Sequence, residues 1–97
     1  MSEPANQPAV RRDVRFRGRV QGVGCRVTTR EIAARFRVAG FVQNLADGQV
    51  LVSAEGEPDE LDRFVAAVVA EMERYVAGYD VEQRPSTGEF NDFHVRR

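Results

Sequence analysis

The sequence predicts a single α+β domain in which an antiparallel sheet carries two helices on one face. Two apolar stripes recur at helical spacing, and several shorter stretches alternate with a period of two. Their order along the chain is strand, helix, strand, strand, helix, strand, with one further short strand at the end. A length of 97 residues leaves room for one such domain.

The first part of the chain predicts a strand followed by a helix. Between Val14 and Val20, apolar or glycine positions alternate with arginines, which is typical of a strand with one face inward. Residues 25–38 then predict a helix, and Gly40 is placed to end it. The buried stripe of this helix comprises Cys25, Thr29, Ile32, Ala33 and Phe36.

The remainder predicts a hairpin, a second helix and two more strands. Phe41–Leu45 and Gln49–Glu55 flank Asp47-Gly48, a strong hairpin signal. Pro58 suits the first turn of a helix that follows. The apolar stripe of this helix comprises Leu61, Phe64, Val65, Val68 and Met72, and the later strands are marked by Tyr79, Val81 and Gln83 and by Phe93–Arg96.

This order of elements favours the ferredoxin-like βαββαβ packing. Right-handed crossovers make the first two strands parallel, with one strand between them. Their carboxyl ends then reach the same edge of the sheet, about 10 Å apart. We therefore expect the glycine-rich loop after the first strand and Asn44 at the end of the second to face one pocket.

The segment from Gly18 to Arg26 holds three glycines and leads into the first helix. A glycine-rich turn lets backbone N–H groups converge, and a helix start adds unpaired N–H donors and the positive end of the helix dipole. Arg26 adds a full positive charge with bidentate geometry. These features together predict a site for phosphate or carboxylate.

Charge is unevenly distributed, although the net charge is only −1. Residues 10–37 hold nine arginines and two acids, whereas residues 47–92 hold twelve acids and three arginines. We expect an electropositive region that contains the glycine loop. A net-acidic domain argues against general nucleic-acid binding, and no apolar run is long enough for a membrane span.

Composition also predicts the character of the N-terminal segment and the cellular compartment of the protein. Residues 1–9 have no basic or apolar block, so we expect a disordered lead-in rather than a signal peptide, with the domain over residues 10–97. The single cysteine agrees with a reducing compartment. We expect a cytoplasmic monomer with no nucleic-acid partner and no membrane association.

Two motifs in register carry a resemblance to a known family. Gly18-Arg19-Val20-Gln21-Gly22-Val23-Gly24-Cys25-Arg26, followed by Gly40-Phe41-Val42-Gln43-Asn44 and Asp47-Gly48, resembles the acylphosphatase family, which shows a G-x-V-Q-G-V-x-F-R loop and then a G-x-V-x-N strand. The ending Phe93–Arg97 looks like the closing strand of that family, so the resemblance covers residues 10–97.

The resemblance implies an enzyme that hydrolyses the carboxyl–phosphate anhydride of small acyl phosphates to carboxylate and inorganic phosphate. It implies no metal or other cofactor and no covalent phospho-enzyme. Arg26 would bind the phosphate, Asn44 would orient the attacking water, and the loop of Gln21, Gly22, Val23, Gly24 and Cys25 would contribute backbone N–H groups. The alternative is a non-catalytic phosphate-binding regulatory module on the same fold.

Several residues keep a second interpretation. Cys25 stands where the family usually has Phe, and it is either a small buried hydrophobe or a reactive thiolate next to Arg26 at a helix start. Gln21 either braces the loop or touches the substrate. Asn44 alone would also suit a turn residue of the hairpin, and His94 is expected on the surface. No pattern predicts a pocket for the acyl group.

Overall fold

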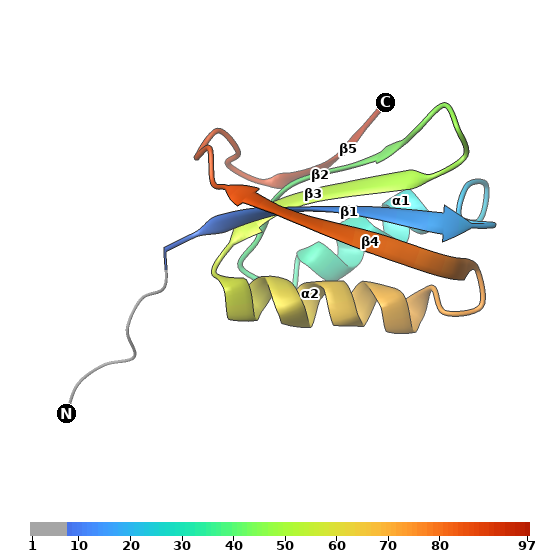
Figure 1. The fold of residues 1–97 in the computed structure, drawn as a ribbon, viewed down its shortest axis with the longest axis horizontal. Helices are drawn as coiled ribbons and strands as arrows, with labels where there is room; N and C mark the ends of the chain where they lie inside the picture. Colours follow the sequence, from blue (N-terminus) through green and yellow to red (C-terminus); the bar gives the residue numbers. More distant parts are fainter. Residues whose placement is uncertain (1–7) are drawn as a thin grey trace.

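The computed structural model describes residues 8–97, so the predicted lead-in over residues 1–9 lies almost wholly outside the described part. A five-stranded sheet, in the order β4-β1-β3-β2-β5, has both helices on one face (Figure 1). The elements are β1 (Val10–Gly18), α1 (Cys25–Ala33), β2 (Ala39–Asn44), β3 (Val50–Gly56), α2 (Pro58–Glu71), β4 (Val76–Pro85) and β5 (Phe93–Arg96). Within residues 8–97, neither helix has the length and apolar content needed to cross a membrane.

The ferredoxin-like prediction is confirmed, with one correction to the sheet. β1 pairs antiparallel with both β3 and β4, and β3 pairs antiparallel with β2. β1 and β2 therefore run parallel with β3 between them, as expected. The sheet is nevertheless mixed rather than antiparallel throughout, because β5 adds to the outer edge of β2 in parallel.

The core lies between the sheet and the helices. Val14 and Phe16 of β1 are 1% exposed, and Leu61 and Phe64 of α2 are fully buried. The predicted stripe of α2 is confirmed apart from Val65, which is only partly buried. Burial of a large apolar side chain contributes about 1.5–3 kcal/mol, so this shared interior is what fixes the helices on the sheet.

The first helix is shorter than predicted. It ends at Ala33 instead of residue 38, because the following turn tightens: Arg35 N–H donates to the Ile32 carbonyl at 2.9 Å and Phe36 N–H to the Ala33 carbonyl at 3.1 Å. Phe36 still packs edge-on against Phe64, with ring centroids 6.0 Å apart. The position of Phe36 in the apolar stripe therefore correctly predicted that it packs against the core, but not that it lies in the helix.

Gly40 does not end that helix, contrary to the prediction. It lies inside β2 with a φ of +151°. A Cβ at this position would lie 1.9 Å from the Ser53 carbonyl oxygen of β3. Glycine is required because the two strands approach too closely for any side chain.

The arginines of β1 are largely neutralised by carboxylates from neighbouring elements. Arg17 pairs with Asp80 of β4, Arg12 pairs with Asp62 of α2, and Arg15 lies 3.9 Å from Glu82 of β4. The uneven charge of the sequence is thus evened out by pairing across the fold. At the loop end, Arg19 and Arg26 take part in none of the ion pairs within residues 8–97, and backbone dipoles add to their positive charge.

Candidate active site

The carboxyl ends of β1 and β2 place two segments at one edge of the sheet. The loop after β1 leads directly into α1, and Asn44 is the last residue of β2. A cavity of about 110 Å³ lies between them, lined by Val20, Gly22, Gly24, Cys25, Arg26, Val27 and Asn44. Residues seventeen to twenty-four positions apart in the sequence are thereby brought to one site.

The backbone of the glycine loop adopts a conformation that favours glycine. Gly22 and Gly24 have φ angles of +81° and +79°. A Cβ at either position would meet no atom within 4 Å, so backbone conformation rather than lack of space calls for glycine. Alternation of left-handed and ordinary residues is the geometry in which successive N–H groups converge on an anion.

The start of α1 adds further donors to the cavity. Gly24 is the N-cap and provides no side-chain cap, and the first turn holds no acidic residue. The first helical hydrogen bond runs from Thr28 N–H to the Gly24 carbonyl at 2.9 Å. The N–H groups of Cys25, Arg26 and Val27 therefore have no acceptor within the helix, and the positive end of the dipole points at the same place.

Arg26 supplies the full charge at this site. It lines the cavity from the first turn of α1 and is partly exposed. Within residues 8–97, none of the ion pairs involves Arg26, in contrast to the arginines of β1. A guanidinium without a carboxylate partner next to free backbone donors suits a doubly charged anion.

Gln21 braces the loop from outside the cavity. Its Nε2 donates to the Leu45 carbonyl at 2.8 Å and to the Gln49 carbonyl at 2.9 Å. Both N–H bonds of the amide are used. Both acceptors belong to the loop between β2 and β3, which begins directly after Asn44. Gln21 thus ties the loop to the strand end that carries Asn44.

Cys25 is a buried free thiol at the start of α1. It is 3% exposed, and its Sγ lies 3.9 Å from Thr29 Oγ1. Burial raises the pKa of the thiol, and the hydrogen bond with Thr29 does not offset it. Burial therefore favours the interpretation of Cys25 as a small buried hydrophobe over that of a reactive thiolate.

Two of the predicted loop residues do not line the cavity, and two other residues do. Gln21 faces the hairpin, and Val23 projects outward with 37% of its surface exposed. Val20 and Val27 line the cavity although the sequence did not single them out. The sequence feature that could have predicted Val27 as a lining residue is its place directly after Arg26 on the first turn of the helix.

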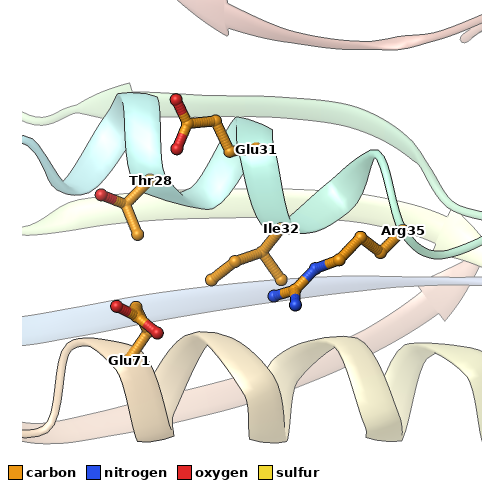
Figure 2. A pocket seen from close by; sticks show the side chains of 5 residues that line it. All are labelled: Thr28, Glu31, Ile32, Arg35 and Glu71. Atoms are coloured by element: carbon orange, nitrogen blue, oxygen red, sulfur yellow. The ribbon is translucent and has the colours of Figure 1, made fainter.

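Other polar groups lie away from this cavity. A separate pocket of about 250 Å³ lies between the helices (Figure 2), lined by Thr28, Glu31 and Ile32 of α1, by Arg35 just after the end of α1, and by Glu71 of α2. It contains none of the predicted site residues. Within the described residues, no three His, Cys, Asp or Glu side chains form a group able to hold a metal ion.

The comparisons with known proteins show the family to which this fold belongs. The family model described as Acylphosphatase matches residues 12–95. An acylphosphatase of Geotalea uraniireducens is 40% identical over 91 residues, covering 89% of this chain and 96% of that protein. One of Pseudomonas aeruginosa is 46% identical, covering 82% and 88% of the two chains. The crystal structure of acylphosphatase from Bacillus subtilis superposes with a TM-score of 0.81 at 30% identity, covering 91% of this chain and 99% of that one. This chain belongs to the acylphosphatase family.

Proposed function

We propose that this protein hydrolyses acyl phosphates by gripping the phosphoryl group at the loop cavity and directing a water at phosphorus. Membership of the family gives the reaction, which is cleavage of the carboxyl–phosphate anhydride to carboxylate and inorganic phosphate. The observation that carries the proposed mechanism is the shared lining of one cavity by Gly22, Gly24, Arg26 and Asn44.

The phosphoryl oxygens are held by two kinds of donor. The free N–H groups of the loop and of the first turn of α1 surround them, and the Arg26 guanidinium binds two of them. These groups are held in place by the fold before substrate arrives. They therefore stabilise the charge that spreads over the equatorial oxygens in the transition state without reorganising.

Asn44 places the nucleophile. Its side-chain amide both donates and accepts hydrogen bonds and does not titrate, so it orients a water without competing for its proton. The bond from the water oxygen to phosphorus forms while the bond to the carboxylate oxygen breaks, and the carboxylate leaves with the electron pair. The proton of the water passes to a phosphate oxygen of the substrate. Since a carboxylate is a good leaving group, the reaction needs positioning more than acid catalysis.

The same proposal includes the conditions under which the enzyme works. The lining of the cavity offers backbone amides, one guanidinium and one carboxamide, which bind anions directly. We propose that turnover needs no metal ion and that the protein acts as a cytoplasmic monomer. A single buried cysteine agrees with a reducing compartment.

The kinetic test compares benzoyl phosphate hydrolysis by the wild type, Arg26→Gln and Asn44→Ala in the presence of a chelator. We expect Asn44→Ala to lower kcat at least a hundredfold while inorganic phosphate still inhibits with an unchanged constant. Arg26→Gln should weaken phosphate inhibition and turnover together, by about 2–4 kcal/mol of transition-state stabilisation. Arg35→Gln, an exposed arginine outside this cavity, is the matched control.

The outcomes separate the alternatives. Full turnover by Asn44→Ala would show that the water is placed by another group. Phosphate binding by the wild type without turnover of any acyl phosphate would indicate the non-catalytic module. Loss of activity in the chelator, restored by a divalent metal, would contradict the metal-independent mechanism.

A further inference from the structure

A pocket at the far end of α1 from the loop cavity, which we call the edge pocket, has no part in the proposed hydrolysis. Its volume is about 460 Å³, and its apolar lining comprises Ala33, Ala34, Phe36, Val38 and Phe93. Phe93 begins β5, an outer strand of the sheet. Pockets that bind small molecules have volumes of about 300–1,000 Å³. The edge pocket has such a volume and shares no lining residue with the loop cavity.

Two aromatic rings contribute most of the apolar lining. Phe36 and Phe93 each pack edge-on against Phe64, with ring centroids 6.0 Å and 5.6 Å from that of Phe64. Phe64 is fully buried, whereas Phe36 and Phe93 are only partly buried. An apolar ring bound in the pocket would therefore remove aromatic surface of both partners from water.

Short side chains keep space open beside these rings. Ala33 is the last residue of α1 and is buried, and Ala34 follows it and is exposed. Both line the pocket, and neither side chain extends beyond Cβ. A larger side chain at Ala34 would take up room in the pocket without entering the core.

The edge pocket also has one positive and one negative side chain in its lining, Arg30 and Glu31. Within residues 8–97, neither takes part in an ion pair. Figure 2 shows that the Glu31 carboxylate points away from α2. Arg30 lies in the last turn of α1, where the helix dipole favours positive groups, including a bound ammonium group. A ligand with one carboxylate and one ammonium group would thus find a partner for each charge.

We propose that the edge pocket binds a zwitterionic α-amino acid with an aromatic side chain. The ring packs on Phe36 and Phe93, the carboxylate pairs with Arg30, and the ammonium group pairs with Glu31. Exposed ion pairs contribute little each, so the aromatic contact supplies most of the affinity and the two charges select the zwitterion. We expect a dissociation constant on the order of 1 mM.

The test is a titration of the purified ¹⁵N-labelled chain with L-phenylalanine, followed by NMR. We expect saturable shifts of the backbone amides of residues 30–38 and 93–95, and none at residues 22–27. Two analogues separate the charges: 3-phenylpropionate lacks the ammonium group, and phenethylamine lacks the carboxylate. Each should bind about threefold more weakly than L-phenylalanine.

Variants assign each charge to its partner. Arg30→Gln should weaken L-phenylalanine and 3-phenylpropionate by about threefold and leave phenethylamine unchanged. Glu31→Gln should weaken L-phenylalanine and phenethylamine and leave 3-phenylpropionate unchanged. Ala34→Leu should weaken all three by about tenfold or more, because it fills the pocket. The matched controls are Arg35→Gln and Ala70→Leu, at exposed positions outside the edge pocket, which should change none of the affinities.

Several results would overturn the edge-pocket proposal. One is the absence of a saturable shift up to about 20 mM L-phenylalanine. Another is a shift centred on residues 22–27, which would place the ligand at the loop cavity. Unchanged affinity in Ala34→Leu would show that the ligand lies elsewhere. Equal affinities of the wild type for the three aromatic compounds would also contradict the proposal, since the two charges would then select nothing.

Discussion

Gln21 shows how a single side chain fixes the geometry of this site. Its amide joins the loop that carries the anion donors to the hairpin that follows Asn44, through the Leu45 and Gln49 carbonyls. The two halves of the site lie at opposite ends of the β1–α1–β2 crossover, on strands separated by β3, so their separation depends on such a tie. We infer that Gln21 is a positioning residue for the reaction.

Replacing Gln21 with Ala should lower kcat more than phosphate binding, because the loop stays intact while its distance from Asn44 is no longer fixed. Loss of two hydrogen bonds should also cost about 1–2 kcal/mol of unfolding free energy. Gln21→Glu should be worse, since a carboxylate would face two carbonyl oxygens. Steady-state kinetics and urea unfolding provide the measurements, and Gln43→Ala, which removes one exposed hydrogen bond to the Arg97 carbonyl, is the control. An effect of Gln21→Ala on phosphate inhibition alone would instead indicate direct contact with substrate.

For single residues, the sequence predicted which side chains share the site but not all of the contacts that they make. The spacing of Arg26 and Asn44 in two motifs was sufficient to predict a shared pocket. The partners of Gln21 lie 24 and 28 residues away, and they accept through backbone carbonyls. A carbonyl acceptor leaves no signature in residue type, so the two interpretations of Gln21 separate only in three dimensions.

Among the elements, β2 and β3 show the tightest constraint. Gly40 brings the backbone of β2 so close to β3 that a methyl group would lie 1.9 Å from the Ser53 oxygen. The same strand ends in Asn44. The position of the Asn44 amide, which we propose orients the water, therefore depends on this close pairing.

Gly40→Ala should destabilise the fold by about 3 kcal/mol or more, because the strands must separate or shift register. Gly48→Ala is a matched control: it also has a positive φ, +93°, but a Cβ there meets nothing within 4 Å. Its cost should be about 1 kcal/mol, from backbone conformation alone. Urea unfolding at equal m-value gives both numbers. Equal losses for the two variants would contradict the close-approach explanation.

The end of α1 illustrates why element boundaries were harder to predict than element types. Apolar spacing continued through Phe36, and the sequence therefore predicted helix to residue 38. The structure ends the helix at Ala33 and binds the Arg37 N–H to Glu60 Oε2 of α2 at 2.9 Å. That contact between the segment after α1 and α2 supplies an acceptor which periodicity along one segment does not reveal.

For the whole molecule, the connection from β4 to β5 is the feature that the sequence pattern did not predict. β4 and β5 are the two outer strands, so residues 86–92 must pass across the end of the sheet (Figure 1). Glu55 of β3, 7% exposed, holds this segment at the end opposite the cavity. Its carboxylate accepts hydrogen bonds from Ser86 Oγ, Thr87 N–H and Oγ1, and Gly88 N–H at 2.7–3.0 Å.

Burial alone would raise the pKa of Glu55, but the hydrogen bonds from Thr87, Ser86 and Gly88 together lower it to about 2. The folded pKa lies below the unfolded value, so this group stabilises the fold above about pH 4.5, and the contribution is lost as the pH falls from there towards 2. We expect Glu55→Gln to cost about 1–2 kcal/mol at pH 7 and to remove most of that pH dependence. Unfolding measured from pH 2.5 to 7 tests this, with the exposed Glu73→Gln as the control. An unchanged acid profile in Glu55→Gln would contradict the role of Glu55.

The central claim is that one anion is held by the loop amides and Arg26 beside the Asn44 carboxamide. The most direct measurement is a titration of the ¹⁵N-labelled protein with inorganic phosphate, followed by NMR. The account predicts that the backbone amides of residues 22–27 and the Asn44 side-chain amide shift with one dissociation constant, and that Arg26→Gln weakens this constant at least tenfold. Shifts confined to another surface, or unchanged affinity in Arg26→Gln, would contradict it.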